Sequence, residues 1–152
     1  MSNTRWIQPS GFHFFDMPDF TAIFVLCPHK TFVIEAEPDL GERFHKAETG
    51  QRCERPLTHE LLSDLCAAVG AKVVGVSLTD VNPERGIFYA VISLEIRNEL
   101  GEKFIELDAR PSDALTLAFR AGAPVRVSEE LLCKCEDAGE LLKKLRAQTP
   151  QG

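Results

Sequence analysis

Three β-rich runs follow one another in the second half of the sequence, with only short polar turns between them. The runs and turns are residues 72–81, 82–85, 86–97, 98–101 and 102–108. In the middle run, apolar residues occupy every second position from Phe88 to Ile96. This alternation is typical of an antiparallel strand that buries one face. We therefore expect a three-stranded meander covered on one side.

Helical periodicity is clearest from Leu57 to Val69, where apolar residues recur at three- and four-residue steps. Thr58 is a candidate N-cap there, and Gly70 a candidate left-handed residue after the helix. The other expected elements are an irregular or weak strand in residues 1–20, strands at 22–27, 31–36 and 124–127, helices at 38–47 and 111–121, a helix opened by Ser128, and an amphipathic tail helix at 136–148 with Leu141, Leu142 and Leu145 on one side.

These elements predict an α+β fold, in which helices pack on a mixed and largely antiparallel sheet. We assign residues 1–135 to one domain and residues 136–152 to a C-terminal helix and tail. An internal echo suggests a degenerate duplication, because 34–38 resembles 107–111 and 58–62 resembles 128–132, at offsets of 73 and 70. Each half would then run hairpin, helix, connector, helix.

The charge balance bears on nucleic-acid binding. The chain has 17 Lys and Arg against 23 Asp and Glu, a net charge of −6, spread evenly over both halves. Proteins that hold nucleic acid through many phosphate contacts usually show a basic stripe. The composition therefore disfavours tight general binding and leaves room for a weakly bound RNA or DNA substrate.

Location and metal chemistry are also constrained by the sequence. The first residues lack the apolar run of a signal peptide, and no stretch is long enough to span a bilayer, so we expect a cytoplasmic protein without a membrane partner. Neither the five cysteines nor the four histidines show zinc-ligand spacing. Phosphate-binding glycine loops of nucleotide enzymes are absent too.

The junction from Asp108 to Asp113 is the strongest candidate site. A strand is expected to end at Asp108 and a helix to begin near Ser112, so free amides, the Ser112 hydroxyl and the Arg110 guanidinium can meet on one anion. With Ile105 and Leu107 directed to the core, Glu106 and Asp108 share the outer face. Glu106, Asp108 and Asp113 are candidate oxygen ligands for Mg²⁺ or Mn²⁺.

A structural interpretation of the same residues stays open. Ser112 can be the N-cap of the helix, Asp113 a first-turn acid that the helix dipole favours, and Arg110 an ion-pair partner of Asp108. His59 has two interpretations as well. At the start of a helix its imidazole is favoured in the neutral form and can accept a proton, or it can serve only as a structural hydrogen-bonding group.

Several segments together resemble the bifunctional nuclease family, the BFN domain of bacteria and plants. The segments are 55–62 (Arg-Pro-Leu-Thr-His-Glu-Leu-Leu), 86–90 (Gly-Ile-Phe-Tyr-Ala), 108–118 beginning Asp-Ala-Arg-Pro-Ser-Asp, and 122–125 (Gly-Ala-Pro-Val). The resemblance implies a compact α+β domain, often a homo-oligomer, with cleavage of RNA and DNA as the activity. The positions that match the family motifs are His59, Asp108, Arg110, Ser112 and Asp113.

The chain departs from the family pattern in its first half. Leu40 stands where the family usually has a glutamate, and Glu60 where an aspartate is usual. If the missing glutamate contributes to the site, Glu35, Glu37 or Asp39 has to replace it, or the protein is altered or inactive.

Two hypotheses follow from the sequence. The first is a metal-assisted nuclease that cleaves phosphodiester bonds of RNA and DNA, with Asp108 and Asp113 as metal-facing catalytic acids, Glu106 as a further metal ligand, Arg110 and Ser112 on phosphate, and His59 as a base. The alternative is a non-catalytic regulatory or scaffold domain that binds a protein or an anionic ligand.

Overall fold

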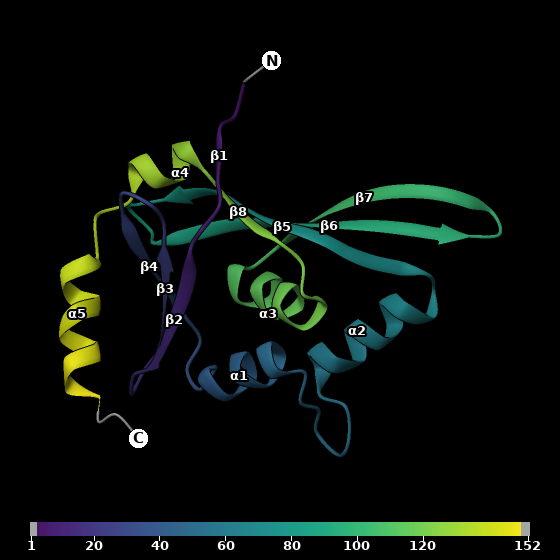
Figure 1. Ribbon diagram of the computed structural model, residues 1–152, viewed down its shortest axis with the longest axis horizontal. Coiled ribbons are helices and arrows are strands. Elements are labelled where there is room, and N and C mark those ends of the chain that lie inside the picture. The colour runs from purple at the N-terminus through teal and green to yellow at the C-terminus, as the bar shows by residue number, and fades with distance from the viewer. Residues whose placement is uncertain (1–2, 150–152) are drawn as a thin grey trace.

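A computed structural model describes residues 3–149 of the chain and confirms the α+β class. Its elements in chain order are β1 (Trp6–Ile7), β2 (Gly11–Asp16), β3 (Thr21–Leu26), β4 (Thr31–Ala36), α1 (Gly41–Thr49), α2 (Thr58–Ala68), β5 (Ala71–Asn82), β6 (Ile87–Asn98), β7 (Gly101–Ala109), α3 (Pro111–Ala121), β8 (Val125–Ser128), α4 (Glu129–Lys134) and α5 (Gly139–Gln148). Figure 1 shows their arrangement around the central helix α3.

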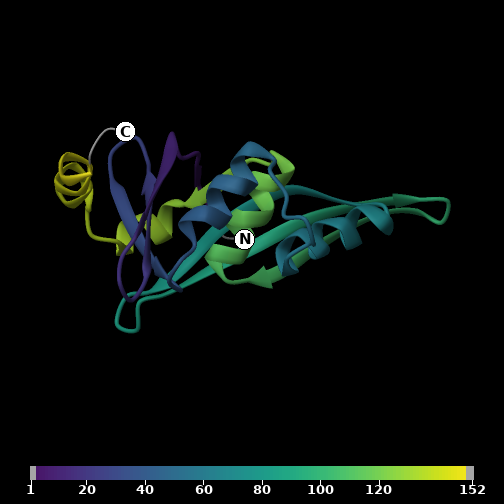
Figure 2. The ribbon, with the colours of Figure 1, turned by 90° about the horizontal axis from the view of Figure 1, so that it is seen from below.

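The larger sheet has five strands in the order β1-β8-β5-β6-β7. The predicted meander forms its β5-β6-β7 part, in which both pairings are antiparallel. β8 joins β5 in parallel, which makes the sheet mixed. The paired ends of β6 and β7 reach well beyond the helices as a long arm (Figures 1 and 2). The expected alternation holds in β6, where Ala90, Ile92 and Leu94 are buried.

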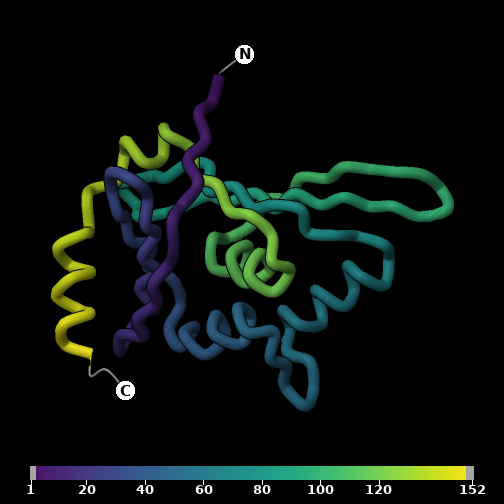
Figure 3. The backbone as a smooth tube through the Cα atoms, in the orientation of Figure 1, coloured from purple at the N-terminus to yellow at the C-terminus, as the bar shows by residue number. Residues whose placement is uncertain are grey.

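The smaller sheet has the order β2-β3-β4 and contains the predicted hairpin of β3 and β4. β3 is apolar at nearly every position because both of its faces are covered. Ile23 and Val25 face the main core, whereas Ala22 and Phe24 pack with Leu142 of α5. Figure 3 follows the backbone of α5 along the outer side of this sheet.

The helix α3 lies between the larger sheet and α1, and it contacts α2 as well. Leu115 and Ala118 are fully buried in the core that it shares with the sheet. The helix ends at Ala121, and its C-cap residue Gly122 has the left-handed conformation at φ 64°. α3 thus has the larger sheet, α1 and α2 as its neighbours.

Two expectations about side-chain placement are wrong. Leu107 is expected to face the core, but it is 46% exposed. Thr58 does not cap α2, because Leu57 occupies the N-cap position and the Glu60 carboxylate accepts its N–H group at 2.8 Å. Helical periodicity identifies an apolar face correctly, but it does not tell what covers that face.

The halves of the chain follow the same element order only in part. The hairpin β3–β4 is followed by α1 and α2, and the hairpin β6–β7 by α3 and α4. The connector in the second half forms β8, whereas residues 50–57 contain no strand. The internal duplication stays a prediction.

Candidate functional site

The helices α1, α2 and α3 lie close together on one side of the larger sheet (Figures 1 and 2), and polar side chains from four segments gather between them. α3 brings its first and last turns, α1 its first turn, α2 its start, and the β4–α1 turn one carboxylate. We call this group the junction cluster, and its members are Glu37, Arg43, His59, Arg110, Ser112, Asp113 and Arg120.

At the N-terminus of α3, the carboxylate of Glu37 stands where the sequence predicts a bound anion. The Ser112 hydroxyl donates to Glu37 Oε2 at 3.1 Å, and Arg110 Nη2 donates to Glu37 Oε1 at 3.3 Å. Arg110 Nε also donates to Asp113 Oδ2 at 2.9 Å. The predicted phosphate-binding residues thus hold a carboxylate of the chain itself.

Two arginines that the sequence did not single out complete the cluster. Arg43 Nη2 lies 3.6 Å from Glu37 Oε1 and 3.8 Å from Asp113 Oδ1, and Arg120 Nη1 donates to the Gln51 carbonyl at 3.1 Å. Within residues 3–149, Nε and Nη2 of both arginines are shielded from solvent and have no hydrogen-bond acceptor. Arg43 Nη2 faces the two carboxylates at ion-pair distance, which leaves Arg43 Nε and the Nε and Nη2 atoms of Arg120 as donors that an anionic ligand can use.

The position of Arg120 follows from a polar stripe on α3. Ser112, Thr116 and Arg120 are four residues apart, so they lie on one face of the helix. Ser112 is 3% exposed and Thr116 is fully buried, and the Thr116 hydroxyl donates to the Ser112 carbonyl at 2.7 Å. A buried polar stripe on an otherwise apolar helix is the sequence signal that could have identified Arg120.

His59 is half-buried in the first turn of α2. Burial lowers its pKa, and the positive charges of Arg120 and Arg43 lower the pKa further. The imidazole is therefore neutral at neutral pH and able to accept a proton. The adjacent Glu60 is 1% exposed and accepts the N–H groups of Leu57 and Cys53, both at 2.8 Å, which fixes the start of the helix.

The remaining predicted residues lie outside the cluster. Glu106 and Asp108 are exposed on β7, opposite Ser93 and Val91 of β6. In the part of the chain that the structure describes, no three His, Cys, Asp or Glu side chains are grouped as metal ligands. The carboxylate of Asp113 already accepts a hydrogen bond from Arg110. These residues do not fit a resident divalent ion.

The structure also decides between details that the sequence left open. Ser112 is not the N-cap of α3, since Arg110 holds that position and Pro111 is the first helical residue. Arg110 pairs with Asp113 and Glu37, and not with Asp108.

The family glutamate position, Leu40, is 5% exposed in the core. Of the three acidic neighbours proposed to replace that glutamate, Glu37 is the one that reaches the junction cluster.

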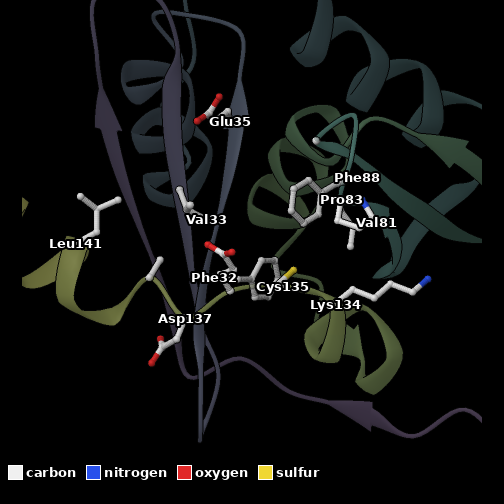
Figure 4. A pocket seen from close by; sticks show the side chains of 13 residues that line it. Phe32, Val33, Glu35, Val81, Pro83, Phe88, Lys134, Cys135, Asp137 and Leu141 are labelled. Carbon is white, nitrogen blue, oxygen red and sulfur yellow. The ribbon is translucent and has the colours of Figure 1, made fainter.

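A separate cavity of about 590 Å³ lies between β4, the β5–β6 turn and the α4–α5 connection (Figure 4). Phe32 and Phe88 form apolar walls, and Glu35 and Asp137 lie at its polar side. Burial raises the pKa of the Cys135 thiol to about 11, so this thiol stays protonated. The cavity contains no residue of the junction cluster.

Comparisons with known proteins agree with the motifs. A family model described as the bifunctional nuclease domain matches residues 32–138, a range that includes the whole junction cluster. Two proteins of Mycobacterium tuberculosis, named Uncharacterized protein MT1877 (strain CDC 1551 / Oshkosh) and Uncharacterized protein Rv1829 (strain ATCC 25618 / H37Rv), are each 38% identical to the chain over 87 residues. The match covers 57% of this chain and 48% of each relative, so it spans about half of their length.

Proposed function

Because the chain belongs to the bifunctional nuclease domain family, we propose that it cleaves phosphodiester bonds of RNA and DNA at the junction cluster. The observation that carries this proposal is the pair of guanidinium groups, Arg43 and Arg120, which lower the pKa of the half-buried His59 and present three shielded nitrogens without an acceptor among the described residues. A phosphodiester supplies the oxygen acceptors that these donors lack.

The chemistry assigned to this site is hydrolysis. A water molecule attacks phosphorus, a new P–O bond forms, and the bond to the leaving ester oxygen breaks. His59 accepts the proton of the attacking water, and the leaving oxygen takes a proton from solvent. Arg43 and Arg120 stabilise the negative charge that develops on the phosphoryl oxygens.

A divalent ion enters the proposal only as an ion that accompanies the nucleic acid. Mg²⁺ is commonly held by one or two carboxylates together with substrate phosphates, and it needs no all-protein cage. No step of the hydrolysis above is assigned to it. RNA and DNA are proposed as weakly bound substrates, in line with the net charge of −6.

Purified protein is expected to hydrolyse single-stranded RNA and DNA oligonucleotides, faster with added Mg²⁺ or Mn²⁺ than in EDTA. EDTA is expected to leave the Tm unchanged, because the proposed ion arrives with the nucleic acid and is not part of the folded protein. Gel assays and thermal melts measure the two effects. Absence of hydrolysis under every metal condition contradicts the nuclease proposal, equal rates with and without metal contradict the role of the ion, and a Tm lowered by EDTA contradicts the arrival of the ion with the nucleic acid.

We also propose that the protein has no membrane partner. No helix within residues 3–149 is long and apolar enough to cross a membrane. The cytoplasmic location is part of the proposal and rests on the sequence alone.

We further propose that the protein is a homo-oligomer that buries the apolar face of α2. This face is 42–59% exposed at every position, and it consists of Leu57, Leu61, Leu62, Leu65 and Val69. Contiguous apolar surface of this kind is uncommon on monomers and typical of protein interfaces. A second copy presents the same face, so two copies can cover each other around a two-fold axis.

Replacing Leu61 and Leu65 together with glutamate is expected to convert the oligomer to monomers, because each interface would then bury charges without partners. Size-exclusion chromatography with light scattering measures the mass. Leu100→Glu is the matched control, since Leu100 is 93% exposed in the β6–β7 turn, and it should leave the mass unchanged. A monomeric wild-type protein would refute the proposal.

A further inference from the structure

Two carboxylates contact both the start of α3 and Arg43: Asp113, within the first turn of the helix, and Glu37, which reaches it from the β4–α1 turn. The Glu37 carboxylate accepts the Ser112 hydroxyl and Arg110, and it lies 3.6 Å from Arg43. The side chain is only one-third exposed. A fixed negative charge therefore borders the donors that are proposed to bind phosphate.

Side chains of the smaller sheet hold the turn that carries Glu37 in place. Asp39 has the left-handed conformation at φ 62°, which is costly for a residue with a side chain. The next two amides are anchored, since Leu40 N donates to Thr21 Oγ1 at 3.0 Å and Gly41 N donates to Asp16 Oδ1 at 2.9 Å. The turn therefore keeps the backbone of Glu37 beside the cluster.

Gly41 shows how tightly this turn is packed. A Cβ atom at this position would lie 2.4 Å from Asp16 Oδ2, so only glycine fits without displacing the carboxylate. Asp16 in turn accepts the Thr21 hydroxyl at 2.8 Å, which ties the anchor to the smaller sheet.

The two phosphate classes that a nucleic acid presents differ in charge by nearly one unit. An internal phosphodiester is a monoanion: its single negative charge is shared by two non-bridging oxygens, and its two ester oxygens are uncharged. A terminal phosphate monoester carries about −1.5 to −2 at neutral pH, spread over three oxygens. Arg43 Nη2 lies 3.6 Å from Glu37 Oε1 and 3.8 Å from Asp113 Oδ1, so the extra negative charge of a monoester held by Arg43 would be added next to these carboxylates. The negative charges of the monoester and of these carboxylates repel each other, and they do so more strongly in a partly buried site than in water.

We propose that Glu37 is a specificity-determining residue, whose carboxylate makes the junction cluster favour internal phosphodiesters over terminal phosphate monoesters. The proposal rests on the proposed function, because it assumes that phosphate binds at Arg43 and Arg120. Glu60, the other buried acid near His59, is directed to the backbone amides of Cys53 and Leu57 and lies 3.9 Å from Arg52. Asp113 also faces Arg43, at 3.8 Å, and the selection is assigned to Glu37 because its carboxylate is nearer, at 3.6 Å.

Two probes of matched shape test this proposal in EDTA: thymidine 5′-monophosphate and its methyl ester. At about pH 8 the first is a dianion and the second a monoanion. Calorimetric titration of the wild type is expected to give tighter binding for the ester. Glu37→Gln should tighten binding of the monophosphate by about tenfold, and that of the ester by no more than about threefold.

Two further variants serve as controls. Glu37→Asp retains the charge and should retain the preference of the wild type for the ester. Glu35→Gln removes one negative charge two residues earlier, at the separate cavity, and should leave both affinities unchanged. Thermal melts establish that every variant is folded at the temperature of the titration.

The proposal is overturned if Glu37→Gln leaves the ratio of the two affinities unchanged, if it weakens both ligands equally in a folded protein, or if neither probe binds the wild type. These results are separable from the nuclease assay. Hydrolysis of oligonucleotides without a charge preference refutes the role of Glu37 alone. A charge preference that depends on Glu37, without hydrolysis, refutes the nuclease proposal and leaves an anion-binding site.

Discussion

Replacing His59 with alanine is expected to lower kcat for oligonucleotide hydrolysis by about 10²–10⁴-fold, the usual contribution of a positioned general base. The imidazole is half-buried, and the neighbouring Arg120 and Arg43 hold its pKa below the ordinary value. Alanine removes the proton acceptor and leaves both guanidinium groups in place. Steady-state kinetics on a single-stranded oligonucleotide measure the effect.

The pH profile separates this role from a structural one. The base acts in its neutral form, so the wild-type rate should fall as the pH drops through the lowered pKa of His59 and stay level above it. The acidic limb should be absent in His59→Ala. His45→Ala on the exposed side of α1 is the matched control and should keep the full rate. A His59→Ala protein with undiminished activity would refute the assignment of the base.

Replacing Phe44 with alanine is expected to destabilise the fold by about 3–5 kcal/mol, the usual cost of removing a buried aromatic ring. Phe44 is fully buried, stacks on Phe14 at a centroid distance of 4.4 Å and meets Phe119 edge-on at 6.0 Å. These rings join β2, α1 and α3, so alanine leaves a cavity where the smaller sheet meets the helices. Urea denaturation measures the loss, and the Tm should fall by about 10 °C.

Phe104→Ala is the control for this experiment, because Phe104 is 70% exposed on β7 and its loss should change stability by no more than about 0.5 kcal/mol. Phe44 also follows Arg43 directly in α1, so a loosened helix should weaken the junction cluster. Equal stabilities of the two variants would show that the aromatic contacts do not hold α1 to the sheet.

The strands were the most predictable part of the fold. Alternation in β6 and the polar turns at 82–85 and 98–101 depend on neighbouring residues only, and the meander was predicted closely. The parallel pairing of β8 with β5 depends on contacts across 49 residues, as between Ser77 and Arg126, and no local pattern encodes it. The leucines of α2 illustrate the same limit, because their periodicity is local and does not reveal that they stay exposed in the folded chain.

The junction cluster was predicted in part. Arg110, Ser112 and Asp113 are contiguous, so the start of α3 brings them together. His59 was identified from the resemblance of residues 55–62 to the family motif, and the structure brings it near Asp113. Arg43 depends on the packing of α1 against α3, which the sequence does not reveal.

The prediction that Asp108 and Asp113 bind a metal ion together stays untested. In the structure, Asp108 is exposed on β7 and Asp113 pairs with Arg110. The pleat of β7 and the first turn of α3 orient these two side chains independently. Five residues of separation were therefore insufficient to predict their relative position.

Both faces of β3 are covered, and one of the covering elements, α5, lies beyond the domain boundary that we predict at residue 135. α5 covers the outer face of the smaller sheet through Leu142, against Ala22 and Phe24. A chain shortened before α5 would present these side chains to water on a sheet whose edge strands are β2 and β4. A fragment that omits the C-terminal helix is therefore expected to self-associate through this sheet, and it is a poor choice for crystallisation or for solution work.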